Sequence, residues 1–285
     1  MTRAILLFVT VLSLAPRLDA QGAATIELER GYRDLYALRF EQAQREFQHW
    51  SAQFPDDARG PVSQAAGDLF AELHRLGVLE AQFFEKDERF ESRSKLKPDP
   101  ALRTRFNSRL TRAEQLARKR LKTVPNDPDA LFALTLVYGL RADYLALIQK
   151  ENMNALKDTR RAAESAEKLL KVAPTYYDAY LATGISNYLV GSLFAPVRWL
   201  LRLGGYTGDR EKGVRHLEIT ARQGRLLAPF ARLLLAVANL RAGDPERARQ
   251  LLVSLRDEFP TNPLFAKEIA RIDARAAKGR TGNGP

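Results

Sequence analysis

The sequence predicts an all-α protein, a right-handed α-solenoid of about five helix–turn–helix hairpins closed by a C-terminal helix. Apolar residues recur at alternating spacings of three and four, which is the period of a helix buried on one face. Several of these helical segments end at a proline that is followed by a new helix start, as at Pro55, Pro125, Pro174 and Pro260.

The repeated unit is clearest near the C-terminus, where Ala248, Leu252, Leu255 and Phe259 form one apolar stripe. Gly243, before this helix, suits a turn with positive φ, and the Asp–Pro pair after it supplies an N-cap and a first helical residue. A Leu-, Ala- and Val-rich segment precedes the turn and reads as the buried partner helix. The unit is therefore helix, tight turn, helix, proline.

Residues 21–277 are predicted to form one domain of such units. The predicted hairpins cover 24–54, 58–124, 128–173, 176–224 and 226–259, a capping helix covers 263–277, and 278–285 form a disordered tail. The second helices of the first three hairpins carry stripes that include Phe40 and Trp50, Phe106 and Leu110, and Ala166 and Leu169.

These units resemble the tetratricopeptide repeat, a helix–turn–helix of about 34 residues. The residues that carry the resemblance are Gly31, Ala43, Phe47, Pro55, Ala113, Pro125, Tyr138, Ala162, Pro174, Gly184, Gly243, Ala248 and Pro260. Thr135 stands where the repeat has glycine, and Ala117 and Ala166 replace bulky residues, so the copies are divergent. The resemblance implies a non-enzymatic scaffold that binds a protein or peptide in a groove lined by the first helices of the hairpins.

Alanine recurs at one position of the second helices, at Ala43, Ala113, Ala162 and Ala248. A small side chain at a helix crossing lets the two backbones approach closely. We therefore expect all four alanines to be buried.

The three middle hairpins are longer than the repeat, with inserts at 77–99, 139–155 and 189–210. The first and third are rich in aromatic residues and arginine, which are typical anchors of protein interfaces, and the second is expected to extend its two helices. The predicted partner-binding residues are Phe83, Phe84, Phe90, Arg93, Tyr144, Phe194, Arg198, Trp199 and Arg202.

The insert around Trp199 is compatible with three roles. It could pack on the hairpins as local core, form a protein-binding patch, or insert Trp and Leu side chains at a membrane surface. The sequence leaves all three open.

The chain carries a net charge of +11, and the segment 86–122 contains 13 basic and 5 acidic residues. Such a stripe attracts polyanions, although a solvated helix face gives the same pattern. The alternative function is therefore a binder of anionic envelope polymer or lipid headgroups through this stripe and the Trp199 insert. Nucleic acid is not an expected partner because the chain is predicted to be exported.

The N-terminus has a basic start and an apolar run from Ala4 to Ala15, with a small residue at Ala20. This pattern predicts a signal peptide at 1–20 and a periplasmic or secreted bacterial protein. An uncleaved N-terminal anchor is the alternative. No later stretch is expected to be long and apolar enough to span a membrane.

Little in the sequence predicts catalysis. The chain has no cysteine and three isolated histidines, His49, His74 and His216, and it contains no recognisable metal, phosphate-binding or nucleophile motif. We expect no cofactor, no metal and no enzymatic activity, and His216 reads as a partly buried structural residue. A helical envelope enzyme with a carboxylate buried in a cleft stays open as a third hypothesis.

Overall fold

The computed structural model describes residues 17–79, 96–193, 205 and 207–281, which form helices and no strand. The α-helices are α1 (Arg17–Tyr36), α2 (Phe40–Gln53), α3 (Arg59–Arg75), α6 (Pro100–Thr123), α7 (Pro128–Tyr144), α8 (Asn152–Val172), α9 (Tyr180–Gly191), α11 (Arg210–Gln223), α12 (Ala228–Arg241), α13 (Pro245–Glu258) and α14 (Pro263–Thr281). A π-helical turn, η1 (Leu145–Gln149), continues α7, and a 3-10 turn, η2 (Tyr177–Ala179), precedes α9. The predicted all-α class is confirmed.

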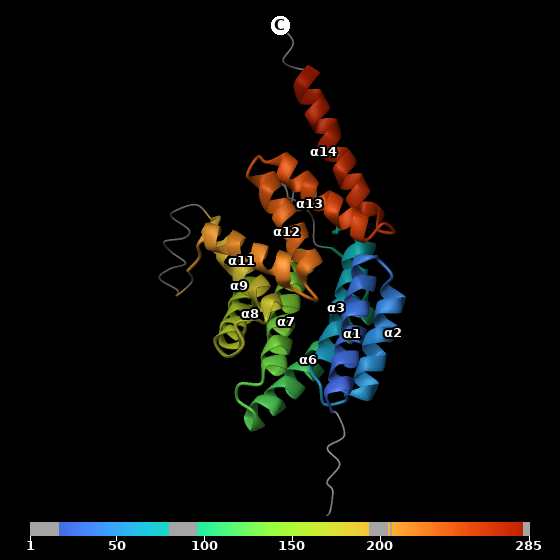
Figure 1. Ribbon diagram of the computed structural model, residues 1–285, viewed down its shortest axis with the longest axis vertical. Helices are drawn as coiled ribbons and strands as arrows, with labels where there is room; N and C mark the ends of the chain where they lie inside the picture. Colours follow the sequence, from blue (N-terminus) through green and yellow to red (C-terminus); the bar gives the residue numbers. More distant parts are fainter. Residues whose placement is uncertain (1–16, 80–95, 194–204, 206, 282–285) are drawn as a thin grey trace, which may run out of the picture.

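The helices pair as the hairpins α1–α2, α3–α6, α7–α8, α9–α11 and α12–α13, and each hairpin packs against the next (Figure 1). The helix α14 packs against α13 at the C-terminal end. This sequential stacking is that of a TPR-like α-solenoid. The second to fifth hairpins lie within a few residues of the predicted bounds, whereas the first begins at Arg17 instead of residue 24.

Two chain ends differ from the prediction. The helix α1 begins at Arg17, inside the segment predicted as a signal peptide, and α14 continues to Thr281. The prediction of a disordered tail was therefore wrong for residues 278–281. The preceding Ala-, Lys- and Arg-rich sequence has high helix propensity, which allows the last turn to continue.

Asp–Pro pairs begin three of the helices. The carboxylates of Asp99, Asp127 and Asp244 each accept a hydrogen bond from a backbone N–H two or three residues later. The following proline occupies the first turn, where its missing N–H costs no helical hydrogen bond. These pairs fix where α6, α7 and α13 start.

The alanines predicted at helix crossings are buried. Ala43, Ala113 and Ala248 have 0% of their surface exposed and Ala162 has 3%. Burial of these small side chains agrees with a close approach of the helices at these positions.

Glycine brings α9 and α11 closer than side chains would permit. A Cβ atom on Gly213 would lie 2.5 Å from the backbone nitrogen of Tyr188, and one on Gly191 would overlap the backbone nitrogen of Arg210. Because Gly191 and Arg210 stand at the two ends of segment 192–209, this contact also brings the ends of the third predicted insert together.

We expect Gly213→Ala to lower the free energy of unfolding by about 1–3 kcal/mol, because the added methyl group meets backbone atoms. At Gly139 in α7, by contrast, an added Cβ has no neighbour within 4 Å. Gly139→Ala should therefore raise the free energy of unfolding by up to about 1 kcal/mol through helix propensity. Urea denaturation followed by circular dichroism measures both, and effects of the same sign and size would contradict this account of the crossing.

The two ends of the helical array meet. The Tyr36 hydroxyl donates a hydrogen bond to the carbonyl oxygen of Leu226 at 2.9 Å, and the Asn262 side-chain amide donates to the carbonyl oxygen of Tyr36 at 2.8 Å. Arg33 forms an ion pair with Glu258 at 2.7 Å. The start of α14 accordingly lies beside the end of α1 (Figure 1). Side-chain hydrogen bonds and an ion pair thus join the first hairpin to the last hairpin and to α14, and the array is closed in this sense.

Among the described residues, Pro128–Gln149 is apolar enough to cross a membrane by length and composition, with 22 residues and a mean hydropathy of 1.6. The prediction that no later stretch is long and apolar enough to span a membrane was therefore wrong. In the structure 61% of its most apolar 18-residue window is buried, and α7 packs against α3, α6 and α8. A helix enclosed on several sides is apolar all round, which accounts for the composition.

Candidate functional site

A cavity of about 80 Å³ lies on the inner face of the array and is partly open to solvent. Its walls come mainly from α1, α3, α7, α9 and α12, the first helices of the five hairpins. Apolar side chains dominate these walls, among them Phe70, Leu136, Leu140, Ile185 and Phe230. This space is termed the central cavity, and it lies along the first helices, where the resemblance implies a groove.

Most polar groups on the walls of the central cavity are satisfied by the protein itself. The hydroxyls of Thr135 and Thr159 each donate a hydrogen bond to a backbone carbonyl four residues earlier. The carboxylate of Asp178 accepts hydrogen bonds from the backbone N–H groups of residues 225–227 at 2.8–3.3 Å. Burial raises the pKa of Asp178, and these backbone hydrogen bonds oppose the rise. Asp178 therefore has a structural role, anchoring the turn before α12.

Asp143 differs from the other polar residues of the cavity. It lies near the C-terminal end of α7, and no hydrogen bond or ion pair within the described chain reaches its carboxylate. Burial raises the pKa of Asp143 from 3.8 to about 7, because surroundings with little water disfavour the charged form. The cavity wall thus carries an acid without a partner that is half ionised near neutral pH.

Gly139 lies one helical turn before Asp143, on the same side of α7, and it also lines the central cavity. Its backbone is helical, and nothing lies within 4 Å of where its Cβ would be. Neither packing nor backbone conformation demands glycine here, although glycine costs a helix about 1 kcal/mol relative to alanine. Its effect on the structure is to leave open space beside Asp143.

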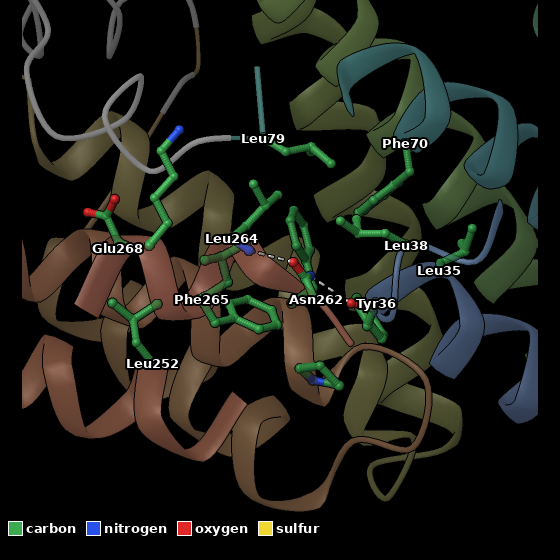
Figure 2. Close-up of a pocket in the computed structure, with 14 residues that line it drawn as sticks. Leu35, Tyr36, Leu38, Phe70, Leu79, Leu252, Asn262, Leu264, Phe265 and Glu268 are labelled. Carbon is green, nitrogen blue, oxygen red and sulfur yellow. Dashed lines mark hydrogen bonds between the residues drawn. The ribbon is translucent and has the colours of Figure 1, made fainter. Parts of the chain in front are cut away.

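A second cavity, of about 60 Å³, lies among α1, α12, α13 and α14. Figure 2 shows Leu38, Leu79 and Phe265 around it, with the Asn262 side chain hydrogen-bonded to Tyr36. This space is termed the end cavity. Among its polar lining residues, Asn262 holds α14 against α1 and Glu268 forms an ion pair with Arg271. We therefore interpret the end cavity as a packing defect where α14 meets α1.

Aromatic side chains separate the two cavities. Tyr36, Phe70 and Phe230 line both of them. The ring centroids of Phe70 and Phe230 lie 5.9 Å apart in an edge-to-face arrangement, and those of Tyr36 and Phe70 lie 6.5 Å apart. The wall that the central cavity shares with the end cavity is therefore largely aromatic.

One predicted partner-binding residue lies in the described chain, and it is a core residue. Tyr144 is 4% exposed and stacks on Phe106 with ring centroids 5.1 Å apart, so it is not a surface anchor. It was misread because a Tyr among apolar residues fits a buried helix as well as an interface. The predicted anchors that lie outside the described residues are Phe83, Phe84, Phe90, Arg93, Phe194, Arg198, Trp199 and Arg202.

The first predicted insert, 77–99, leaves the fold beside the end cavity, and its last residue is hydrogen-bonded to α3. The buried carboxylate of Glu72 accepts a hydrogen bond from the Asp99 backbone N–H at 2.7 Å and pairs with Arg75 at 2.7 Å. Leu79 lines the end cavity. The second insert, 139–155, is formed by the end of α7, η1 and the start of α8, in agreement with its helical pattern.

The basic stripe is partly neutralised where the structure describes it. Four of its 13 basic residues, at 86, 89, 93 and 95, fall outside the described chain, which leaves nine. Five of the nine pair with carboxylates: Arg105 and Arg109 with Asp68, Arg118 with Glu114, Lys119 with Asp56, and Arg120 with Asp127. Pairing reduces the field that a polyanion would meet.

His216 is half-buried, and its Nδ1 lies 2.7 Å from the hydroxyl oxygen of Thr183. Burial, with Lys212 and Arg215 nearby, lowers the pKa of His216. Within the described residues, no three His, Cys, Asp or Glu side chains are grouped so as to hold a metal ion.

No family model matches this sequence, and no curated protein does. Among solved structures, the fold is similar to the crystal structure of a thermophilic TPR protein from Thermus thermophilus. The two chains share 17% sequence identity with a TM-score of 0.44, and the match covers 87% of this chain and 98% of that one. At this level of similarity, the TPR-like description rests on the order and packing of the hairpins themselves.

Proposed function

We propose that the protein is a non-enzymatic scaffold that binds a segment of another protein on its inner face. The observation that carries this proposal is the central cavity, an apolar hollow that receives residues from the first helices of all five hairpins. A ligand seated there would touch the whole array, which is how stacked repeats present an extended binding surface.

The size of the central cavity supports a polypeptide rather than a free small molecule. About 80 Å³ accommodates one side chain, whereas pockets for drug-sized ligands span about 300–1,000 Å³. Even the best small ligands gain only about 1.5 kcal/mol per heavy atom. High affinity therefore requires that the inserted side chain belongs to a longer segment, as anchor residues of protein interfaces do.

We further propose that the inserts 77–99 and 189–210 contact the same partner, and that the protein acts outside the cytoplasm. Contact of the inserts with the partner is supported by their aromatic and arginine residues, and by the position of Leu79 at the end cavity. Action outside the cytoplasm is supported by the apolar run from Ala4 to Ala15 behind a basic start.

The test uses peptides selected by display against the immobilised full-length chain. Their affinities are measured by fluorescence anisotropy for the unmodified chain, for Gly139→Leu and for Glu167→Leu. Leucine at 139 fills the open space on the cavity wall and should weaken binding at least about tenfold, or 1.4 kcal/mol. Glu167 is exposed on α8, so its replacement controls for added apolar surface and should leave binding unchanged.

Circular dichroism first establishes that the three chains are equally folded. Equal affinity for all three would place the peptide away from the central cavity and would contradict the proposal.

A further inference from the structure

We propose that the central cavity selects a basic side chain, a lysine or arginine of the bound segment, whose charged end pairs with Asp143. This inference rests on the proposed function and specifies what the bound segment inserts.

The first argument is that Asp143 is the charged group of the described cavity wall that the protein leaves without a partner. Asp178, the other acid on the wall, is held by backbone N–H groups. The Tyr36 hydroxyl donates to the Leu226 carbonyl, and the Tyr32 hydroxyl accepts from Ser63.

The charged neighbours of Asp143 along α7 and α6 are also occupied. Arg141, two residues before it, pairs with Glu114 of α6 at 3.0 Å. The guanidinium of Arg141 also lies 5.7 Å from the ring centroid of Tyr138. No protein cation is therefore directed at Asp143 within the described chain.

The second argument is the shape and polarity of the space. Lysine and arginine bury a flexible apolar stem along apolar surface and keep a charged head at its end. Leu136, Leu140 and Ile185 provide the apolar wall, and the missing side chain of Gly139 leaves room one turn before Asp143. Apolar walls with an acid among their lining residues match that stem and head.

The third argument is energetic. Asp143 is half-buried and has no partner within the described chain. An ionised carboxylate in such a position is unfavourable, and a cation delivered by a ligand reduces that penalty. An acidic ligand would be repelled, and a neutral one would leave the carboxylate unpaired. The rise in the pKa of Asp143 to about 7 is caused by burial alone, which agrees with a site that lacks its cation.

The test uses n-butylammonium, which reproduces the stem and head of lysine, with n-butanol and n-butyrate as probes of the same length. Each is titrated into the ¹⁵N-labelled full-length chain, and the backbone amide shifts of residues 136–143 are followed at pH 8. We expect saturable shifts with n-butylammonium and at least about tenfold weaker binding of the other two. Equal affinities for n-butylammonium and n-butanol would overturn the proposal.

Asp143→Asn keeps the shape of the side chain and removes its charge. This variant should bind n-butylammonium and n-butanol equally, whereas a retained preference for the ammonium would place its recognition elsewhere. For the unmodified chain, affinity for n-butylammonium should fall about tenfold from pH 8 to pH 6, because protonation of Asp143, with its pKa of about 7, removes the charge. Constant affinity over this range would also overturn the proposal.

The selected peptides separate this inference from the proposed function. We expect them to be enriched in lysine or arginine and to lose affinity for both Asp143→Asn and Gly139→Leu. If Gly139→Leu abolishes binding and Asp143→Asn leaves it unchanged, the scaffold function stands and selectivity for a basic side chain is wrong. If n-butylammonium binds as expected and the peptides bind equally to all variants, cation binding at Asp143 is supported. The proposal that the peptide binds in the central cavity is then wrong.

Discussion

Asp178→Ala is expected to lower the free energy of unfolding by about 3–5 kcal/mol, because it leaves several buried backbone N–H groups without an acceptor. The Asp178 carboxylate accepts from the N–H groups of residues 225–227. The carbonyl of Leu226 in the same turn accepts the hydrogen bond from Tyr36 that helps to close the array. Loss of Asp178 therefore loosens both the start of α12 and its contact with α1.

Urea denaturation monitored by circular dichroism measures this effect. Asp257→Ala is the matched control, because Asp257 is an acid on α13 with 61% of its side chain exposed and an ion pair to the adjacent Arg256. Such exposed pairs contribute at most about 1 kcal/mol. If Asp178→Ala costs no more than Asp257→Ala, the carboxylate does not hold the turn.

The second large effect is expected at Asp143, where replacement by asparagine should raise the free energy of unfolding by about 2–4 kcal/mol at pH 8. The folded state raises the pKa of this carboxyl from 3.8 to about 7, so the folded chain holds the proton more tightly than the unfolded chain does. The stability that Asp143 contributes is therefore present at low pH and is lost as the pH rises toward and through 7. Asparagine carries no charge and lacks this penalty.

The measurement is urea denaturation of both chains at pH 5 and pH 8. The stabilisation by Asp143→Asn should be larger at pH 8, by about 2–3 kcal/mol. A difference that is the same at both values would show that Asp143 is as well solvated in the folded chain as in the unfolded one. That result would remove the energetic argument for a cationic ligand.

Local patterns in the sequence were sufficient to predict the hairpins. Apolar stripes at helical spacing, Asp–Pro pairs such as Asp127 and Pro128, and small residues such as Ala248 each act within one or two turns. Their physical basis is short-range, so one sequence reveals them. The groove lined by the first helices was implied by the resemblance to the tetratricopeptide repeat.

Closure of the array could not be predicted in this way. The contacts that close it, such as Tyr36 with Leu226 and Arg33 with Glu258, join residues about 190 and 225 positions apart. Their formation depends on how each hairpin is oriented on the one before it. Close approach of α9 and α11 at Gly213 contributes to that orientation.

The two residues that distinguish the central cavity, Gly139 and Asp143, were also missed, although the sequence carried a signal. In the apolar run "LFALTLVYGLRADYLALI" a glycine and an aspartate stand one turn apart. A helix-breaking residue and an acid on one side of a buried helix are unfavourable for folding alone. Their presence could have been read as the mark of a binding site, whereas Tyr144 in the same run was read as an anchor and lies in the core.

The central claim is that the inner face of the array binds the partner segment. The most direct test is an isotope-filtered nuclear Overhauser measurement between a selected peptide and the methyl-labelled full-length chain. Contacts from the peptide to the methyl groups of Leu136 and Ile185, which line the central cavity, are the expected result. Contacts confined to exposed methyl groups such as those of Met153 and Val172, which are 63% and 42% exposed, would contradict the account.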